Sequence, residues 1–416
     1  MIVGFIGMSH LGVCHAVTTA EKGFTVKCFD QSFHRIERLR KGLIDFFEPN
    51  LNKLLKKNKK KIEFVNNIID LRECDLVFFS KDIPTDSKNK SKYNEINALI
   101  KKATKYMNKK SVFIILSQVK PGFTETIKWN KKNLYYQVET LIFGEAINRA
   151  LKPEQLIIGS FNNKIHKKYL EFLNNYNSKI NIMSYKSAEL SKISINLYLI
   201  SSLSFTNSIA ELCEKIDADW SKIQPILRQD RRIGKYAYLN PGLGILSGNL
   251  QRDLETYKKT LSENNCNLQI PKAWKKNSNL RKNWVKDLLN SEFKSFLKKR
   301  VGLYGLTYKK DTATLKNSPS ISLIKELKKT NFNVYDPKAS IKKLNFKNVI
   351  IYNDIVKFLK TSDLLIILTD WNEIKNCNYK ILSNYKGKQI IDPYKAIQSK
   401  KLIKNKKIYS LAKKIR

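Results

Sequence analysis

Short apolar runs alternate with longer amphipathic stretches in the first third of this 416-residue chain. Strands are expected at residues 2–6, 25–29, 75–79 and 111–116, and the stretch 10–22 has the spacing of a helix. Strands that alternate with helices through short connections pair in parallel, and the helices then cover both faces of the sheet. The first third of the sequence therefore predicts a doubly wound α/β domain.

The middle of the chain has a different pattern. Between residues 187 and 217, apolar side chains recur at helical spacing and no Gly or Pro interrupts them. A helix of this length is typical of a spine between domains or of the core of a dimer. Helical segments continue to about residue 299.

Strand–helix alternation restarts at residue 300 and predicts a second parallel-sheet domain. Strands are expected at residues 301–304, 333–335, 349–352, 364–368 and 389–391, with a helix at 321–328. We see no internal repeat in the sequence. We expect three domains with the boundaries 1–186, 187–298 and 299–416.

The segment GMSHLG at residues 7–12 follows the first expected strand and opens the first helix. It is close to the fingerprint G-x-G-x-x-G, whose glycines permit a tight turn and close helix–strand packing. Ser9 takes the middle position, where its Cβ narrows the approach to a pyrophosphate. Asp30 ends the second strand, where a carboxylate accepts ribose hydroxyls and repels a 2′-phosphate. The pattern predicts an NAD site made of Gly7, Ser9, Gly12, Asp30 and Arg35, although a Rossmann-like domain without a cofactor also fits.

Motifs along nearly the whole chain resemble those of the UDP-glucose/GDP-mannose 6-dehydrogenases, and they follow in the same order. They are FEPNL (47–51), IPTD (83–86), SQVKPG (117–122), VETL (138–141), AELSK (188–192), RIG (232–234), PGLG (241–244), GLTYKKDT (305–312), YDP (335–337) and TDW (369–371). The resemblance implies two Rossmann-like parallel-sheet domains joined by a long central helix and a helical middle domain. It also implies an NAD-dependent oxidoreductase of polysaccharide biosynthesis that binds a nucleotide sugar and forms a homodimer.

The resemblance assigns roles to individual residues. Glu139 is expected to act as a base through water, Lys192 to stabilise a developing alkoxide, and Asp253 to pair with that lysine and the water. Lys192 and Asn196 are four residues apart and therefore share one helix face. The resemblance thus gives five catalytic positions, which are Glu139, Lys192, Asn196, Asn249 and Asp253.

The remaining expected contacts are with the two ligands. Cofactor contacts are expected from Thr85, Gln118 and Lys316, and substrate contacts from Leu141, Arg232, Tyr238, Gly242, Gly244, Tyr308 and Lys309. Arg232 is expected to reach the substrate pyrophosphate across the dimer interface, a task that suits a planar guanidinium.

The active loop departs from the family pattern G-G-S-C-F-x-K-D. Residues 246–253 read LSGNLQRD, so Asn249 stands at the position of the nucleophilic cysteine, and the next cysteine is Cys266. A carboxamide cannot form the thiohemiacetal and thioester through which the family's second oxidation passes. The other departures from the family motifs are Gln118, Val138, Phe143, Lys316 and Tyr394.

Three interpretations stay open. The chain is a nucleotide-sugar dehydrogenase that stops after one two-electron step or uses NAD transiently, or it completes a four-electron oxidation through an aldehyde hydrate. In the third interpretation it is a non-catalytic protein that binds NAD or a nucleotide sugar. The sequence does not reveal which sugar or which nucleotide base is bound.

The net charge is +42, with 66 lysines and 12 arginines against 36 acidic residues. The lysines are spread from end to end, so we interpret the charge as a solvated surface that favours anionic substrates and not as a nucleic-acid site. No apolar run is long enough for a membrane span, and no basic leader precedes the first strand. The six cysteines and four histidines form no metal-binding pattern, and we expect a cytoplasmic protein.

Overall fold

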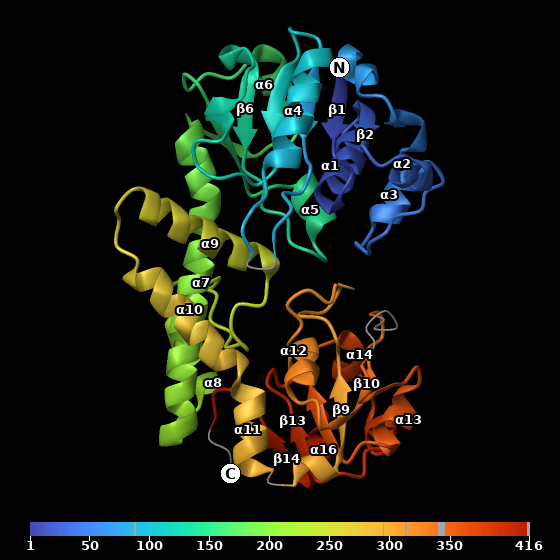
Figure 1. The fold of residues 1–416 in the computed structure, drawn as a ribbon, viewed down its shortest axis with the longest axis vertical. Coiled ribbons are helices and arrows are strands. Elements are labelled where there is room, and N and C mark those ends of the chain that lie inside the picture. The colour runs from blue at the N-terminus through green and yellow to red at the C-terminus, as the bar shows by residue number, and fades with distance from the viewer. Residues whose placement is uncertain (87–88, 294, 313, 340–345, 414–416) are drawn as a thin grey trace. The chain divides into compact units, whose positions relative to one another are not determined.

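The computed structural model describes residues 1–86, 89–293, 295–312, 314–339 and 346–413 (Figure 1). The chain divides into two compact units, Met1–Ile195 and Asn196–Arg416. The division into three domains stays a prediction.

The first unit contains an eight-stranded sheet in the order β3-β2-β1-β4-β5-β6-β7-β8 within the described residues. Its strands are β1 Ile2–Ile6, β2 Thr25–Phe29, β3 Ile62–Val65, β4 Leu76–Phe79, β5 Val112–Ile115, β6 Leu134–Gln137, β7 Gln155–Ser160 and β8 Lys179–Ser184. Neighbouring strands are parallel except for the antiparallel pair β6–β7. The predicted doubly wound α/β class is confirmed, and this antiparallel pair is an addition that the sequence did not indicate.

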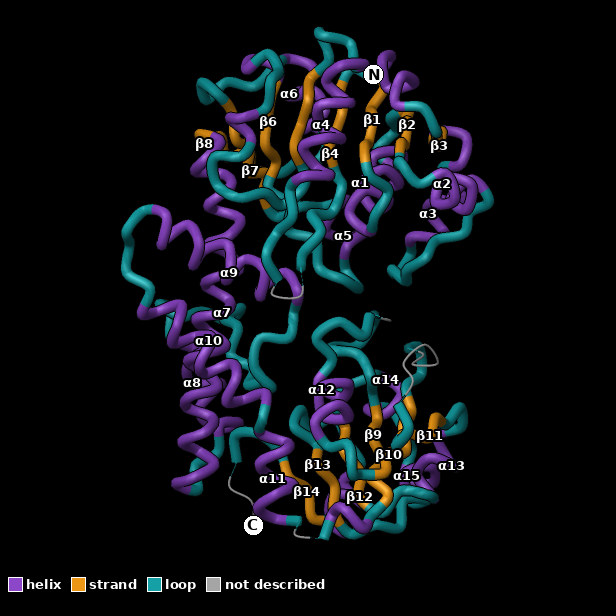
Figure 2. The backbone as a smooth tube through the Cα atoms, viewed as in Figure 1, coloured by secondary structure: helices purple, strands orange, loops and turns teal. Residues whose placement is uncertain are grey.

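The helices of the first unit connect these strands (Figure 2). They are α1 His10–Glu21, α2 Phe33–Arg40, α3 Leu51–Lys57, α4 Asn94–Tyr106, α5 Ala146–Leu151 and α6 Lys167–Asn174. The four strands and the first helix that the sequence predicted in this region are all present within one or two residues. Strands β3, β6, β7 and β8 were missed.

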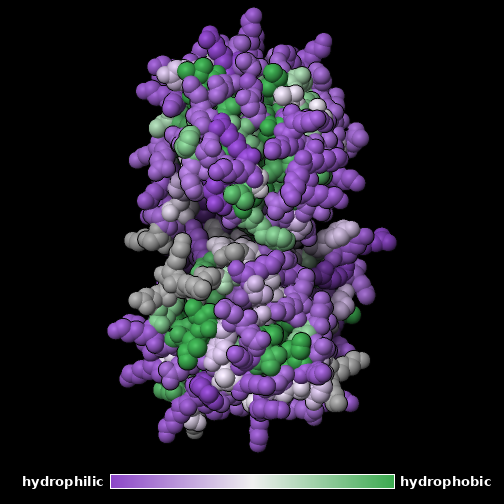
Figure 3. Space-filling model, turned by 90° about the vertical axis from the view of Figure 1, so that its right-hand side faces the viewer, coloured by the Kyte–Doolittle hydropathy of each residue, from purple (hydrophilic) through white to green (hydrophobic). Residues whose placement is uncertain are grey.

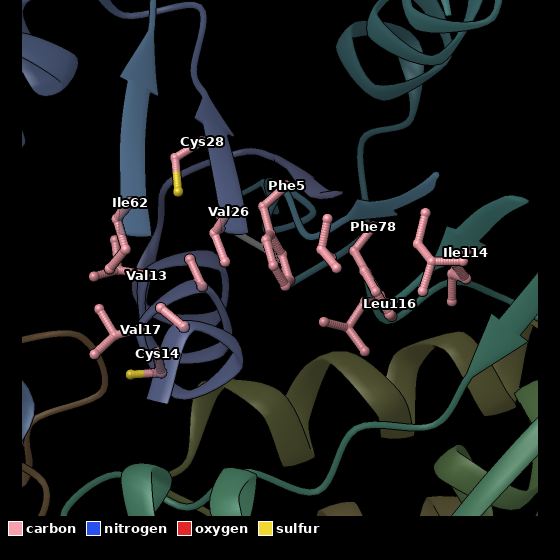
Figure 4. Close-up of a cluster of buried hydrophobic side chains, with 14 of the residues drawn as sticks. Phe5, Val13, Cys14, Val17, Val26, Cys28, Ile62, Phe78, Ile114 and Leu116 are labelled. Atoms are coloured by element: carbon pink, nitrogen blue, oxygen red, sulfur yellow. The ribbon is translucent and has the colours of Figure 1, made fainter. Parts of the chain in front are cut away.

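Helix α1 packs on one face of the first sheet through a hydrophobic cluster. Val13, Cys14 and Val17 of α1 belong to the same buried cluster as Phe5 and Phe78 of the neighbouring strands β1 and β4. Figure 4 shows the strand side chains directed toward the side of the sheet where this helix lies. Burial of this apolar surface is the main source of the unit's stability.

Gly12 allows α1 to approach β1 closely. A Cβ at residue 12 would lie 1.9 Å from the carbonyl oxygen of Gly7, a separation that no side chain tolerates. Glycine at this position is therefore a packing requirement, as the sequence predicted.

The second unit begins within α7, a 32-residue helix over Tyr185–Ile216. It continues with α8 Trp220–Gln229, α9 Gly248–Glu263, α10 Gln269–Lys282 and α11 Trp284–Glu292. A parallel sheet follows in the order β11-β10-β9-β12-β13-β14. Its strands are β9 Arg300–Tyr304, β10 Asn331–Tyr335, β11 Val349–Ile351, β12 Leu364–Ile367, β13 Gln389–Ile391 and β14 Lys407–Tyr409. Its helices are α12 Pro319–Glu326, α13 Ile355–Lys360, α14 Asn372–Lys375, α15 Tyr379–Leu382 and α16 Lys400–Asn405.

The second sheet repeats the strand order of the first six strands of the first sheet, although the sequence shows no repeat. In the first sheet, Gly7 N–H donates to the carbonyl of Phe29 at 2.8 Å, at the crossing from β1 toward the end of β2. In the second sheet, Gly305 N–H donates to the carbonyl of Tyr335 at 2.8 Å in the equivalent place. Strand order and backbone hydrogen bonds can be formed by many different side chains. The two sheets can therefore share them without similar sequences.

The surface is dominated by hydrophilic side chains on the face drawn in Figure 3, where hydrophobic areas are small. Among the described helices, none combines the length and the apolar composition that crossing a membrane requires.

Replacing Gly12 by Ala is expected to destabilise the first unit by about 1–3 kcal/mol, because the new Cβ overlaps the Gly7 carbonyl oxygen. Urea unfolding followed by far-UV circular dichroism measures the effect. The control is Gly242→Ala, whose Cβ would meet Leu203 only at 3.8 Å. An unchanged unfolding midpoint for Gly12→Ala would contradict the packing argument.

Candidate functional site

The turn after β1 requires a glycine at its first position. Gly7 has a φ of +98°, and a Cβ there would lie 2.6 Å from the Cα of Lys81. Because L-residues with side chains rarely adopt this conformation, Gly7 lets the backbone turn sharply from the strand into α1.

Ser9 is the N-cap residue of α1, but its side chain does not cap the helix. Its hydroxyl donates instead to the carbonyl of Ser80 at 3.4 Å. The first turn of α1 also carries no acidic residue. The N-terminus of a helix in this condition offers its backbone N–H groups to an anion, as a pyrophosphate site requires.

Asp30 lies at the end of β2 and is 2% exposed. Its carboxylate accepts from the N–H groups of Met8 at 2.8 Å and Ser32 at 2.9 Å, and from the Arg35 guanidinium at 3.1 Å. Burial acts to raise the pKa of Asp30, but the two backbone donors and the positive charges of Lys81 and Arg35 outweigh it, so the pKa is lowered. The buried carboxylate stays ionised, as a ribose acceptor must.

The predicted cofactor residues Thr85 and Gln118 lie in the segments that follow β4 and β5. Thr85 forms an antiparallel bridge with Ser91, and the neighbour of Gln118, Ser117, donates its hydroxyl to the carbonyl of Lys81 at 2.6 Å. Strands β1 and β4 are adjacent, and the strand order reverses between them. Ligands of open α/β sheets bind at such a switch point, beyond the carboxyl ends of the strands.

The segment after β6 carries Glu139 and Leu141. The Leu141 side chain packs against the hydrophobic cluster beneath α1. Glu139 contacts Nε2 of His15 and accepts from the N–H of Thr140 at 2.6 Å. Burial acts to raise the pKa of Glu139, but His15, the Thr140 N–H and Lys192 outweigh it and lower the pKa.

A second histidine–carboxylate pair holds the same segment. His10 Nε2 lies 2.9 Å from Glu48 Oε2, and Glu48 accepts from the N–H groups of Gly144 at 3.1 Å and Ala146 at 2.8 Å. The rings of His10 and Phe143 are 4.2 Å apart. Glu48 thereby ties the FEPNL segment and the start of α1 to the segment that carries Glu139.

Lys192 and Asn196 lie one turn apart on α7, as predicted. In the second unit, the Asn196 amide donates to Asp253 at 2.5 Å, and Arg252 Nε donates to the other oxygen of the same carboxylate at 3.3 Å. Asp253 is 1% exposed. The structure therefore brings together Asn196, Arg252 and Asp253, which lie far apart in the sequence.

The loop before α9 is fixed by contacts of its backbone. Gly244 has a φ of +76°, and a Cβ there would lie 2.4 Å from the carbonyl oxygen of Ser278. Gly242 N–H donates to the Asn207 side chain at 2.8 Å, and Ile245 N–H donates to the Ser278 hydroxyl at 2.8 Å. Gly244 is therefore required by the conformation of the loop, and the N–H of Gly242 helps to hold the loop in place.

Asn249 is the second residue of α9 and its side chain is exposed. The Lys316 side chain lies beside this helix start, since its Cε is 3.8 Å from an ideal Cβ at Gly248. Lys316, predicted as a cofactor residue, thus lies near Asn249, which the resemblance places at the family's cysteine position.

The predicted substrate residues Tyr238 and Tyr308 interact in the second unit. Burial raises the pKa of Tyr308 to about 12, and the charge of an ionised Tyr238 adds to this shift. Tyr394, which stands at a departure from the family motif, has its pKa raised by burial, and Asp370 and Tyr238 contribute. Lys309 follows Tyr308 and is partly exposed. Tyr238 therefore lies within electrostatic range of both Tyr308 and Tyr394.

Arg232 lies on the surface of the second unit, just after α8. Its side chain is 89% exposed, and its guanidinium donates to Asp230 at 3.0 and 2.7 Å. The bidentate pair holds the guanidinium outward at the end of α8.

The sequence reasoning did not find His10, His15 or Glu48. Histidine is scarce in this chain, with four in all, and two of them lie five residues apart on α1. That scarcity was the available signal, but the carboxylate partners could not be read from the sequence, because they come from distant segments.

Comparison with known proteins identifies the family. The UDP-glucose/GDP-mannose dehydrogenase family models match in all three of their parts: the NAD binding domain over residues 1–176, the central domain over 186–279, and the UDP binding domain over 302–399. The chain belongs to the UDP-glucose/GDP-mannose dehydrogenase family.

Curated relatives are similar to this chain over most of their lengths. A UDP-glucose 6-dehydrogenase of Rickettsia bellii (strain RML369-C) is 28% identical, with 94% of each chain covered. A UDP-glucose 6-dehydrogenase of Bacillus subtilis (strain 168) is 27% identical over 90% of this chain and 89% of that protein.

Solved structures show the same fold. A UDP-glucose dehydrogenase from Pyrobaculum islandicum has a TM-score of 0.86 at 22% identity, with 99% of this chain and 98% of that chain covered. A UDP-D-ManNAc dehydrogenase from Pyrococcus horikoshii also has a TM-score of 0.86, at 18% identity and 99% coverage of both chains. The predicted Rossmann-like fold of both sheet domains is confirmed.

The cofactor of this nucleotide-sugar dehydrogenase is NAD, in agreement with the sequence prediction. The match to the UDP binding domain supports a nucleotide sugar as the substrate. Among the described residues, no group of three or more His, Cys, Asp or Glu side chains could hold a metal ion.

Asp30 gives a pH-dependent test of the cofactor turn. Because its pKa is lowered in the folded state, its stabilising contribution is full above the ordinary Asp pKa of about 4 and is lost as the pH falls through the folded value. Asp30→Asn is expected to cost about 1–3 kcal/mol at pH 7, since Met8 N–H and Arg35 lose a charged acceptor.

Urea unfolding of both proteins between pH 7 and pH 3 checks this expectation. The difference in unfolding free energy between them should shrink as the pH falls. A difference that stays constant across this range would show that the Asp30 charge does not stabilise the turn.

Proposed function

We propose that this chain is an NAD-dependent nucleotide-sugar dehydrogenase that oxidises a sugar hydroxyl by hydride transfer without the covalent thioester step. The observation that carries the proposal is Asn249 at the start of α9, four residues before the buried Asp253. The UDP-glucose 6-dehydrogenases among the relatives make UDP-glucose the first substrate to test.

The residues of the first unit fit NAD. The strained turn at Gly7, the uncapped N-terminus of α1 and the ionised Asp30 provide the backbone donors and the carboxylate that a pyrophosphate and a ribose require. When bound, NAD supplies the acceptor for a hydride. The Cβ of Ser9 leaves less room for a pyrophosphate than glycine would. The Ser9 hydroxyl, however, donates to the Ser80 carbonyl and does not cap the N–H groups at the start of α1.

The groups that serve alcohol oxidation are retained. Glu139 has a lowered pKa and is therefore ionised at neutral pH, which is the form that a general base needs. Lys192, on the same helix face as Asn196, can stabilise the negative charge that develops on the sugar oxygen. Asp253 is held by Asn196 and Arg252, which orient its carboxylate.

The second oxidation lacks its nucleophile. A thioester requires a thiolate that attacks the aldehyde carbon, and the Asn249 carboxamide has no nucleophilic electron pair for this step. We therefore expect the reaction to stop after one two-electron step and to release an aldehyde or its hydrate.

Counting the NADH formed per UDP-glucose consumed tests the proposal. The exposed Cys266 is replaced by Ser so that iodoacetamide cannot alkylate it. One NADH per sugar is expected. Two NADH per sugar with sensitivity to iodoacetamide would overturn the proposal, whereas two without sensitivity would indicate oxidation of the aldehyde hydrate. Thermal stabilisation by NAD and UDP-glucose without turnover would indicate a non-catalytic binding protein.

Asn249→Cys in the Cys266→Ser background is expected to raise the yield from one NADH per sugar to two. The N-terminus of α9 stabilises a thiolate at this position, because the helix dipole and free N–H groups lower a thiol pKa there. Iodoacetamide should then abolish the second step. The matched control is Asn264→Cys, at the exposed C-terminal end of the same helix, which should alkylate slowly and yield one NADH.

A homodimer is part of the proposal, and α7 supports it. Tyr198, Phe205 and Leu212 recur every seven residues on this helix and are 50–65% exposed. An exposed apolar row of this kind is typical of a helix that packs against a partner helix. Exposed Arg232 is then available to the nucleotide sugar of the partner subunit, which is the role its family resemblance implies.

Phe205→Glu is expected to dissociate the dimer, since it places a charge in the apolar row of α7. Sedimentation velocity measures the state of association. If Arg232 acts across the interface, the same variant should also weaken UDP-glucose binding roughly tenfold, as loss of a charged hydrogen bond does. Phe161→Glu, on an exposed side chain outside α7, is the control, and an unchanged dimer in Phe205→Glu would refute the interface.

A further inference from the structure

His15 occupies a position for which the family resemblance gives no role. It lies on α1, five residues after His10, and its side chain is 10% exposed. Its Nε2 contacts Oε2 of Glu139, the residue expected to act as the base. A buried imidazole in contact with a carboxylate orients that carboxylate and stabilises its charge.

Both oxygens of the Glu139 carboxylate are engaged. His15 contacts one, and the N–H of Thr140 donates to the other at 2.6 Å. The Thr140 carbonyl in turn accepts from Nε of Arg149 at 2.9 Å. The carboxylate is therefore fixed from α1 on one side and from its own backbone on the other.

His15 and Glu139 line a small cavity of about 20 Å³. A space of this size holds about one water molecule, and it has the polar partners that a water needs. Arg149 and Tyr176 complete the charged and titratable lining. The pair thus sits at a protected, polar pocket inside the first unit and not on the open surface.

Burial and the neighbouring groups act in opposite directions on the pKa of Glu139. Glu139 would have a raised pKa from burial alone, and the largest opposing influence is His15, followed by the Thr140 N–H and Lys192. Glu139 in turn raises the pKa values of Cys14 and Tyr176, which burial has already raised. The groups that act on the pair or line its cavity are Cys14 from α1, Arg149 from α5, Tyr176 after α6, and Lys192 from α7.

We propose that His15 is a positioning residue for Glu139, which it holds oriented and ionised so that Glu139 can receive the proton of the substrate hydroxyl. The proposal rests on the proposed function. In the oxidation, the O–H bond breaks and its proton passes to Glu139, directly or through water. The hydrogen on the same carbon leaves with its electron pair as a hydride and reduces NAD⁺ to NADH.

The first test observes the pair without requiring turnover. In the full chain labelled with [δ-¹³C]glutamate, the Glu139 carboxyl resonance is assigned by its loss in Glu139→Gln and titrated by NMR. In His15→Gln, which keeps a donor near the Nε2 position but has no charge, the Glu139 titration midpoint should rise by about one pH unit. His34→Gln, on an exposed histidine of α2, should leave it unchanged. An unmoved midpoint in His15→Gln overturns the proposal.

The second test uses the pH dependence of kcat/KM for UDP-glucose. Glu139 must be ionised to accept a proton, so a raised pKa moves the acid limb of the profile to higher pH. His15→Gln should shift this limb by about one pH unit and keep the plateau within a few fold, while His15→Ala should lower the plateau as well.

A uniform loss of activity without a shift would identify His15 as a packing residue and overturn the proposal. If the unaltered chain turns over no nucleotide sugar, the proposed function fails and with it this role. The NMR titration would still report whether His15 acts on Glu139, so the two failures can be told apart.

Discussion

The carbonyl oxygen of Gly7 occupies the place where residue 12 would otherwise carry a Cβ, and the first unit depends on this close approach of α1 to β1. With α1 held there, its N-terminus faces the carboxyl edge of the sheet and the Met8 N–H reaches Asp30. The same placement directs His10 toward Glu48 and His15 toward Glu139. One steric constraint thus organises both the cofactor turn and the predicted base.

The second sheet has the same glycine turn after its first strand, but the aspartate beside it has different hydrogen-bond partners. A Cβ at Gly305 would lie 2.4 Å from the Thr369 side chain, and Leu306 N–H donates to Asp336 at 2.7 Å, as Met8 N–H does to Asp30. Asp336, however, also accepts from the Trp371 indole and from the N–H groups of Lys338 and Ala339. Its acceptor capacity is used within the protein, whereas Asp30 accepts from three donors and retains capacity for a ribose hydroxyl.

The active loop separates two requirements of the chemistry. Charge stabilisation depends on buried, oriented groups, and Asp253 with Asn196 and Arg252 meets this requirement. Covalent catalysis depends on a single nucleophilic atom, and in the proposed function Asn249 takes its place at the N-terminus of α9. Under the proposed function, such a scaffold supports hydride transfer without acyl transfer.

The sequence by itself determined the α/β class, the long helix α7, the cofactor turn and the absence of the cysteine, because these depend on local periodicity, glycine conformation and residue chemistry. It missed β3, β6, β7, β8 and β14. It also missed the antiparallel pairing of β6 with β7, because strand direction is set by contacts between distant segments. The pairing of Asn196 with Asp253 and of His15 with Glu139 was also decided by the tertiary structure alone. Each pair joins side chains more than fifty residues apart, and no spacing along the chain encodes which buried donor meets which carboxylate.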